Sequence, residues 1–336
     1  MPADGRIPTG GRLTYAEAAN AALRRALDER AECIVFGEDV ALPGGVFGVT
    51  KGLRRSYGGR VFDTPISETA MLGAAVGAAL VGMRPIVEIM WMDFALVAFD
   101  QIVNQAANAR YVSRGRLSAP LTIRTQQGSQ PGACAQHSQS LEALLTHVPG
   151  IRVCLPSTAQ EAYDLLVAAI WCDDPVVVIE NRNLYFAGRH DVRTGGAVQA
   201  AFGAALRRPG SDVTLLSWGA MVGQALAAAD QLAADDIQVE VIDARWLSPF
   251  DLATVFASVR KTGRLVIAHE ANLTGAFSAQ VVASVAEAGE RLRCPPVRIG
   301  APDVRIPAAP SLLSAVIPDA DLIAARIRQM ARSEAG

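Results

Sequence analysis

Short apolar runs alternate with longer, Ala-rich segments along most of the chain. Alternation of this kind is typical of strands and helices that are arranged around a mainly parallel sheet. In the first half, the predicted strands are Cys33–Phe36, Ile86–Met90, Leu121–Arg124, Arg152–Leu155 and Val176–Glu180. The predicted helices are Thr69–Val81, Phe94–Val112, Ser140–His147 and Ala159–Trp171. The pattern predicts an α/β fold.

The periodicity lapses from Asn181 to about Ala200, where Gly, Arg and Asn replace the apolar runs. We interpret this stretch as a linker and divide the chain into a first domain at 1–185, a linker at 186–200 and a second domain at 201–336. In the second domain the predicted strands are Val213–Trp218, Val239–Ile242, Leu265–Ala268 and Val297–Ile299. The predicted helices are Val222–Ala233, Asp251–Val259 and Phe277–Glu287.

The helix that follows Glu68 is unusual in its small residues. They recur at helical spacing and comprise Ala70, Gly73, Ala74, Gly77, Ala78 and Gly82. Each glycine inside a helix costs up to about 1 kcal/mol. Such a row indicates that another backbone packs very closely against this helix.

The composition of the chain bears on which partners and which cellular compartment are expected. The 336 residues include 31 basic and 33 acidic side chains, with a formal net charge of −2 and no polybasic run, so neither nucleic acid nor an anionic membrane is an expected partner. No apolar stretch reaches the roughly 18 residues that span a bilayer, and the first residues do not resemble a signal peptide. The five cysteines are widely spaced without a C-x-x-C pair. We therefore expect a cytoplasmic protein whose cysteines are small buried hydrophobes.

Polar residues at the ends of predicted strands are the candidates for chemistry, because open parallel sheets bind ligands there. Glu38 follows the first predicted strand, Glu68 begins the small-residue helix, and His137 lies in a loop before another helix. Each also has a structural interpretation. Glu68 could be an acidic residue in a first helical turn after a Ser67 cap, and His137 a loop histidine that is hydrogen-bonded to a carbonyl.

Several longer stretches of the sequence, taken together, resemble a known family more specifically than any short motif does. They are FGEDV at 36–40, GGVFGVTKGL at 44–53, RVFDTPISE at 60–68, GAAVGAALVGMRPIVEIM at 73–90, DFALVAFDQIVNQAANARY at 93–111, AQHSQSLEALLTHVPGIRV at 135–153 and VIDARWLSPFD at 241–251. Together they resemble the E1 β subunits of 2-oxo acid dehydrogenase complexes, a group that includes pyruvate, branched-chain 2-oxo acid and acetoin dehydrogenases. The resemblance spans nearly the whole chain. It implies a pyrimidine-binding domain for thiamin diphosphate followed by a transketolase-type C-terminal domain.

The resemblance also implies roles for single residues. Glu68 is the expected carboxylate that hydrogen-bonds N1′ of the cofactor's aminopyrimidine and so favours its activation. Ile66 and Phe94 match the residues that contact the pyrimidine ring. His137 matches the histidine that supports decarboxylation and acyl transfer to lipoamide. Glu38 and Asp100 match acidic positions on a proton path between paired active sites.

The other half of the cofactor site is expected on a second chain. In this family a Gly-Asp-Gly motif binds the diphosphate and Mg²⁺, and the sequence contains no Gly-Asp-Gly. The resemblance therefore implies an α subunit that carries the motif in an α2β2 tetramer, with a lipoyl domain and an E2 acyltransferase core as further partners. Some members also hold a structural K⁺ through main-chain carbonyls. The matching residues are Leu121, Ala169, Ile170, Cys172 and Asp174, and Cys172 stands where an acidic residue is common.

Two alternatives remain open at this point. A split transketolase or synthase would use the same thiamin domain with another acceptor, and Glu68 would keep its role. A non-catalytic scaffold subunit would need neither Glu68 nor His137. The sequence does not indicate whether the substrate is pyruvate, a branched-chain 2-oxo acid or acetoin.

Overall fold

A computed structural model describes residues 10–195 and 202–332 of the chain. The contacts divide it into two compact units. Unit 1 comprises Met1–Gln127 and Leu144–Phe202, and unit 2 comprises Gly128–Ala143 and Gly203–Gly336. Unit 2 thus includes a short segment, 128–143, that lies in the first half of the sequence.

Unit 1 is built on a parallel sheet with the strand order β6-β7-β5-β4-β2-β3. Its strands are β2 (Cys33–Gly37), β3 (Val61–Asp63), β4 (Arg84–Ile89), β5 (Thr122–Gln127), β6 (Arg152–Cys154) and β7 (Val176–Asn181). A separate antiparallel ribbon joins β1 (Gly10–Leu13) to β8 (His190–Arg193). Every residue of β5 and β7 is buried, as expected for central strands of a parallel sheet.

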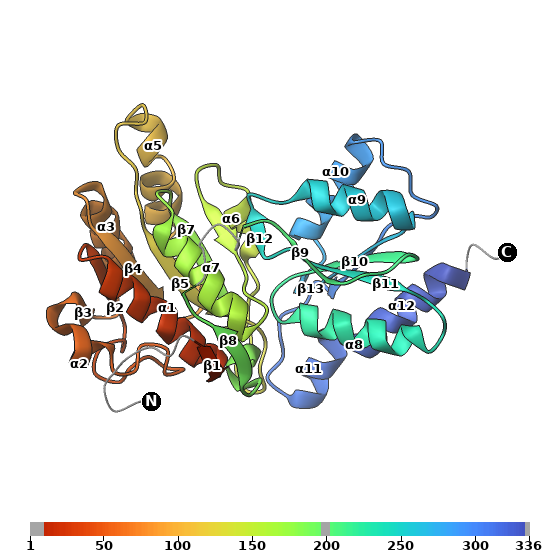
Figure 1. Ribbon diagram of the computed structural model, residues 1–336, viewed down its shortest axis with the longest axis horizontal. Coiled ribbons are helices and arrows are strands. Elements are labelled where there is room, and N and C mark those ends of the chain that lie inside the picture. The colour runs from red at the N-terminus through yellow and green to blue at the C-terminus, as the bar shows by residue number, and fades with distance from the viewer. Residues whose placement is uncertain (1–9, 196–201, 333–336) are drawn as a thin grey trace. The chain divides into compact units, whose positions relative to one another are not determined.

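Helices surround this sheet. They are α1 (Tyr15–Glu29), α2 (Leu53–Tyr57), α3 (Glu68–Leu80), α4 (Met92–Ala95), α5 (Ala109–Val112), α6 (Glu142–Thr146) and α7 (Ala159–Trp171), with short 3₁₀ turns at Gly58–Arg60 and Arg182–Phe186. Helices α1 and α7 pack side by side over the sheet (Figure 1). Thr14 and Thr158 accept hydrogen bonds at the first turns of these two helices, which is why the helices begin there.

Most predicted elements of unit 1 are confirmed, but the single helix predicted over Phe94–Val112 is wrong. The segment contains α4, a π-helical turn at Gln101–Ala106 and α5. Within the π-helical turn the Ala107 amide donates to the carbonyl of Ile102, five residues back. Side chains of Asn104 and Asn108 also bond within the segment, to Asp100 and to the Asn104 carbonyl. A single π-helical turn adds about one residue to the helical repeat, which is too small a change for the apolar periodicity to reveal.

The stretch expected to be a linker is only partly described. Residues 190–193 form β8, which pairs with β1. The final part, 196–200, lies outside the described residues. The pairing of β8 with β1 depends on a partner about 180 positions away, so the loss of periodicity did not reveal it.

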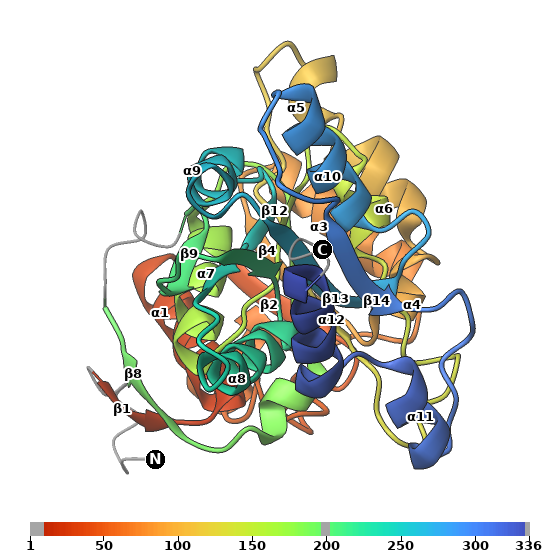
Figure 2. The same cartoon turned by 90° about the vertical axis from the view of Figure 1, so that its right-hand side faces the viewer.

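Unit 2 contains a second sheet with the order β14-β13-β10-β11-β9, in which β9 is antiparallel to β11. The strands are β9 (Ala205–Arg208), β10 (Val213–Ser217), β11 (Val239–Asp243), β13 (Leu265–Asn272) and β14 (Val297–Ala301), and a short strand β12 (Trp246–Ser248) follows β11. The helices are α8 (Met221–Ala233), α9 (Leu252–Thr262), α10 (Phe277–Glu287), α11 (Pro310–Val316) and α12 (Ala320–Arg332). Helices α8 and α12 lie side by side (Figure 2) and close an apolar core with Leu215, Val241 and Val266.

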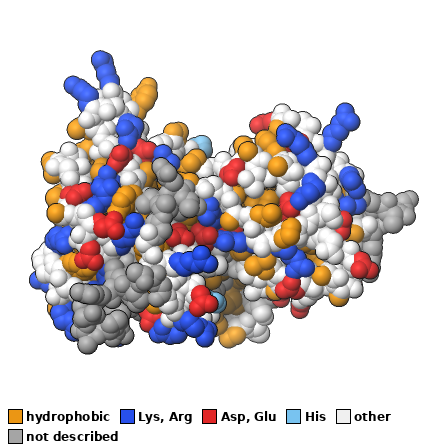
Figure 3. All heavy atoms as spheres, viewed as in Figure 1, with side chains coloured by type: hydrophobic (Ala, Val, Ile, Leu, Met, Phe, Trp, Pro, Cys, Tyr) orange, Lys and Arg blue, Asp and Glu red, His pale blue; other side chains and the backbone are white. Residues whose placement is uncertain are grey.

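Charge is distributed without a dominant sign over the face drawn in Figure 3, where Lys and Arg side chains are interspersed with Asp and Glu. Basic side chains gather at the end of unit 1 near α5, where Arg110, Arg114 and Arg116 are exposed. Tyr111 and Val112 are also exposed there.

Candidate functional site

The carboxyl ends of neighbouring parallel strands bring several predicted site residues to one edge of unit 1. Glu38 directly follows β2, Glu68 follows β3 after a short loop, and Phe94 follows β4 in α4. Ile66 lies in the loop between β3 and α3. Because these strands are parallel neighbours, their ends share one edge, which is where open α/β sheets bind ligands.

Glu68 is the first residue of α3 and is 7% exposed. The helix dipole favours a carboxylate at this position. Ser67 stands at the N-cap, but its side chain makes no capping hydrogen bond. Within the described ranges the Glu68 carboxylate likewise makes no hydrogen bond to another residue. A carboxylate held by the backbone in this way is available as a hydrogen-bond acceptor for a bound molecule.

Glu38 lies close enough to Glu68 for the two carboxylates to influence each other. Burial raises the pKa of Glu38, and repulsion from Glu68 and Asp39 raises this pKa further. Among the described residues, the Oε1 atom of Glu38 is buried without a hydrogen-bond partner. Burial and neighbouring carboxylates both disfavour the ionised form of Glu38.

A polar network that the sequence analysis did not identify lies next to this pair. The buried Arg124 guanidinium donates to Glu88 and, with two nitrogens at 2.8 and 2.7 Å, to Glu180. Gln126 donates to Glu88 at 3.3 Å and accepts the Trp91 amide at 3.3 Å. The network therefore reaches the start of α4, where Trp91 has a positive φ of 70°. The sequence feature that could have revealed this network is the presence of Glu88, Arg124 and Glu180 inside predicted strands.

Phe94 and Ile66 lie on the two segments that frame Glu68. Ile66 is 81% exposed, and Phe94 is half-buried in α4. The Thr69 hydroxyl donates to the carbonyl of Val97 at 2.8 Å and ties the first turn of α3 to the segment after α4. This bond links the segment that carries Ile66 and Glu68 to the segment that carries Phe94.

Asp100 is exposed and makes local contacts. It accepts hydrogen bonds from Asn104 at 2.7 Å and from Gln101 at 3.4 Å, at the start of the π-helical turn. These bonds explain its place in the fold. Its role in a proton path stays a prediction.

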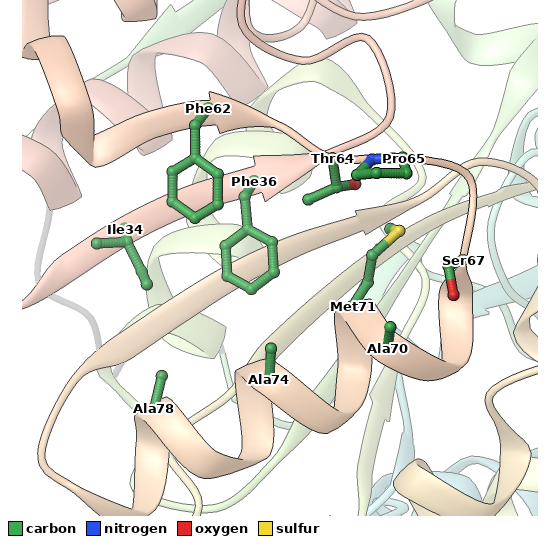
Figure 4. A pocket seen from close by; sticks show the side chains of 10 residues that line it. All are labelled: Ile34, Phe36, Phe62, Thr64, Pro65, Ser67, Ala70, Met71, Ala74 and Ala78. Atoms are coloured by element: carbon green, nitrogen blue, oxygen red, sulfur yellow. The ribbon is translucent and has the colours of Figure 1, made fainter.

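An apolar groove runs beside the first turns of α3. It encloses about 320 Å³ and is lined by Ile34, Phe36, Phe62, Thr64, Pro65, Ser67, Ala70, Met71, Ala74 and Ala78. The rings of Phe36 and Phe62 are stacked, and they face the helix across the groove from Ala74 and Ala78 (Figure 4). The small residues of α3 that prompted the packing prediction, Ala70, Gly73, Ala74 and Gly77, are exposed.

His137 is half-buried in the segment 128–143, which belongs to unit 2. Glu68 belongs to unit 1. A joint role of the two residues therefore stays a prediction.

Four of the five carbonyls expected to hold K⁺ already have partners in unit 1. The Arg84 guanidinium donates to the Ile170 carbonyl at 3.0 Å and to the Cys172 carbonyl at 2.9 Å. The Ala169 carbonyl accepts the Cys172 amide, and the Leu121 carbonyl accepts the Val176 amide. Asp174 forms ion pairs with Arg110 and Arg152, which lower the pKa of its carboxyl group. Because a guanidinium is itself a cation, this arrangement fits a bare potassium ion poorly.

In residues 10–195 and 202–332 no group of three or more His, Cys, Asp or Glu side chains is arranged to hold a metal ion. No helix in the same ranges has the length and apolarity needed to cross a membrane.

Comparisons with known proteins agree with the two-unit architecture. The transketolase pyrimidine-binding domain matches residues 12–187, and the transketolase C-terminal domain matches residues 203–323. A solved structure described as a split-gene transketolase, inactive β4 tetramer, superposes with a TM-score of 0.73 at 24% identity, covering 95% of this chain and 98% of the other. At this identity the superposition shows the shared fold.

Relatives of higher identity come from three enzymes. The chain is 42% identical to the β subunit of acetoin:2,6-dichlorophenolindophenol oxidoreductase from Cupriavidus necator, covering 95% of this chain and 97% of the relative. It is 41% identical to the pyruvate dehydrogenase E1 component subunit β of Staphylococcus epidermidis, with 88% and 91% covered. It is 42% identical to the 2-oxoisovalerate dehydrogenase subunit β of Pseudomonas aeruginosa, with 82% and 83% covered. The chain belongs to the transketolase-like family of E1 β subunits of 2-oxo acid dehydrogenases.

Proposed function

We propose that this chain, paired with an α subunit, forms a thiamin-diphosphate-dependent enzyme that decarboxylates a 2-oxo acid, or cleaves acetoin, and passes the acyl group to lipoamide. The observation that carries the proposal is the buried Glu68 carboxylate at the start of α3, which makes no hydrogen bond within the described ranges. Family membership supplies the reaction class, because the relatives are named for acetoin, pyruvate and 2-oxoisovalerate.

The residues at the edge of unit 1 fit the aminopyrimidine half of the cofactor. When bound, thiamin diphosphate supplies a carbon nucleophile through loss of its thiazolium C2 proton. Glu68 accepts a hydrogen bond from N1′ and holds the proton at that atom. Ile66 and Phe94 provide apolar contacts to the pyrimidine ring. The raised pKa of Glu38 supports a role beside Glu68 as a group that stays protonated at higher pH than an ordinary carboxyl group.

The remaining catalytic residues act in later steps. His137 donates a proton and stabilises negative charge on the substrate oxygen during decarboxylation and acyl transfer. Asp100, which is exposed and bonded to Asn104, continues the acidic path away from Glu38. The diphosphate and Mg²⁺ are held mainly by the α subunit, through a Gly-Asp-Gly motif that this sequence lacks.

The α subunit is the occupant that we propose for the exposed face of α3. Gly77 on this face has open space where a Cβ would lie, and a Cβ at Gly73 would make one ordinary van der Waals contact, with the Gln101 side chain at 3.8 Å. The adjoining groove presents almost entirely apolar side chains. A helix of a second chain could approach this face closely, because no large side chain keeps it away.

This interface has a matched test. Gly77→Leu should fold normally and fail to assemble with the α subunit, because the new side chain occupies the space of the partner. Gly223→Leu on α8 is the control, since Gly223 is also an exposed helical glycine with open space around its Cβ position. Size-exclusion chromatography with light scattering distinguishes the two. Normal assembly of Gly77→Leu would remove α3 from the interface.

The assembled enzyme is expected in an α2β2 tetramer that delivers its acyl group to the lipoyl domain of an E2 acyltransferase core. We place it in the cytoplasm, where its five cysteines would remain in the thiol state that the structure shows.

The activity itself is tested by co-expression with an E1-type α subunit. Dye-linked oxidation is measured with pyruvate, with 3-methyl-2-oxobutanoate and with acetoin. We expect Mg²⁺- and thiamin-diphosphate-dependent turnover of at least one substrate by the pair, and none by this chain alone. Tight, Mg²⁺-dependent binding of thiamin diphosphate to the isolated chain in calorimetry would contradict the two-subunit site.

A further inference from the structure

The segment that carries His137 is held by unit 2 at several points. Near its start Ser129 is bonded to β13, and Gly132 donates its amide to the carbonyl of Ala308 at 3.0 Å. Near its end Gln139 accepts a hydrogen bond from Arg305 at 3.0 Å, and Glu142 accepts one from the Trp218 indole at 3.1 Å. The C-terminal part of the chain therefore determines where this segment lies.

Glu270 on β13 makes the most concentrated of these contacts. Its Oε1 atom accepts both the backbone amide of Ser129, at 2.5 Å, and the Ser129 hydroxyl, at 2.7 Å. Ser129 is 5% exposed and Glu270 is 8% exposed. Hydrogen bonds to a charged acceptor are roughly twice as strong as neutral ones, and burial protects them from competition with water.

Glu270 also lies against the middle of the segment. It lines a small cavity of about 50 Å³ together with Ala135, Ser138 and Gln139 on the segment and with Asn272 and Arg305 on the opposite side. Ser138, which follows His137 directly, is 2% exposed. Residues on both sides of His137 are thus packed beside the glutamate that fixes Ser129.

We propose that Glu270 is a positioning residue for His137 and acts through Ser129. This inference rests on the proposed function, in which His137 is a catalytic group. The carboxylate fixes the position of the Ser129 backbone, and the segment that follows then presents His137 in one orientation. Without the carboxylate the Ser129 amide and hydroxyl lose their shared acceptor, and the segment samples positions in which His137 does not reach the substrate.

The test uses the assembled α/β enzyme with the substrate that the wild type converts. Glu270→Ala should lower kcat by about 10²-fold, the size of loss that a displacement of about 1 Å produces at a reacting group. The KM for the substrate should change less than about 3-fold, because uniform substrate binding does not involve the segment. Glu270→Gln keeps an Oε1 acceptor and should retain kcat within about 5-fold of wild type. Glu287→Ala on the exposed surface of α10 is the control and should leave kcat unchanged.

A double-mutant cycle distinguishes positioning from a general structural role. If Glu270 acts through His137, then Glu270→Ala should cause almost no further loss of kcat in a His137→Ala background. An additive loss in that background, or a wild-type kcat for Glu270→Ala, would overturn the proposal. Ser129→Ala removes one of the two hydrogen bonds and serves in the same cycle if Glu270→Ala does not assemble. It should lose about 3- to 10-fold in kcat, and an additive loss with His137→Ala has the same meaning.

Failure of the proposed function has a different signature. If the wild-type pair converts none of the three substrates, or if His137→Ala turns over like wild type, the functional assignment fails. If the wild type is active and His137→Ala is impaired while Glu270→Ala is normal, the positioning role alone fails.

Discussion

Two pairs of buried glutamates in unit 1, one inside the sheet and one at its edge, differ in how their charge is balanced. Glu88 and Glu180 share the guanidinium of Arg124, which is fully buried between them. Glu38 and Glu68 lie at the carboxyl-end edge of the same sheet, where each adds to the negative potential at the other. A buried carboxylate with a cation has its charge compensated, so removal of the cation is costly, whereas one without a cation favours a bound partner or a proton.

The largest expected effect comes from substitution of Arg124, which removes the cation shared by Glu88 and Glu180. Arg124→Met leaves Glu88 and Glu180 buried without a cation, and we expect a loss of about 3–5 kcal/mol in the free energy of unfolding. Urea denaturation measures this loss. Arg110→Met is the control, because it removes an ion pair to Asp174 whose arginine side chain is half-exposed, and it should cost about 1 kcal/mol or less. A change below about 1 kcal/mol in Arg124→Met would show that the network is not a stabilising unit.

The second test acts on the unbalanced pair. Glu68→Gln keeps the size of the side chain at the start of α3 but cannot hold the N1′ proton as a carboxylate does. In the assembled enzyme we expect turnover to fall by at least about 10²-fold, which corresponds to a barrier increase of about 2.7 kcal/mol. The melting temperature should not fall, because a buried charge without a cation is removed. Hydrogen–deuterium exchange at C2 of the bound cofactor isolates the step, and exchange at the wild-type rate would remove Glu68 from its proposed role.

The third test uses pH. The pKa of Glu38 is raised in the folded chain by burial and by neighbouring carboxylates, so folding favours its protonated form. The stability associated with this residue is therefore present below the unfolded pKa and is lost as pH rises through the folded pKa. Glu38→Gln should raise the stability of the chain by about 1 kcal/mol or less at pH 8 and by less at pH 4. Equal changes at both pH values would show that Glu38 is ionised without penalty.

The smallest expected effect concerns the carbonyls of Ile170 and Cys172, which accept hydrogen bonds from Arg84. Exchange of sodium for potassium at equal ionic strength should change the melting temperature of the wild type by less than about 1 °C, because Arg84 already supplies a positive charge there. If the potassium concentration were about 100 times the Kd of a potassium site, binding would add about 2.7 kcal/mol to the free energy of unfolding. The melting temperature would then rise by roughly 5–10 °C. Differential scanning calorimetry in both salts decides the matter, and a potassium-specific rise of several degrees would restore the expected site.

Local pattern was sufficient for much of unit 1. The predicted helix Ala159–Trp171 has the bounds of α7, because Thr158 caps its start and its apolar period is regular. Strand β7 was anticipated to within one residue at its end, since an uninterrupted run of Val and Ile is typical of a central parallel strand. The positions of Glu38 and Glu68 at the carboxyl ends of strands also followed from the order of elements, whereas Phe94 was named only through the family resemblance.

Other features depend on contacts that sequence periodicity does not record. The bond from Ser129 to Glu270 joins positions 141 residues apart, so the membership of segment 128–143 in unit 2 could not be anticipated. The same holds for the Arg84 contacts to Ile170 and Cys172. The break in the predicted helix at 94–112 has a different cause, because one π-helical turn adds only about one residue to the repeat and leaves little trace in the apolar pattern.

The ribbon of β1 and β8 has a consequence for the stability of the outer strands of unit 1. Gly10 pairs with Arg193 and Leu13 with His190, so two described strands about 180 positions apart hold each other in place. Arg189 reinforces this pairing through the Arg12 carbonyl and the Glu17 carboxylate. Strands near the end of a chain segment fray unless other contacts hold them down. Because β1 and β8 are each other's partners, opening of one strand would leave the other unpaired, and the two strands are expected to open together.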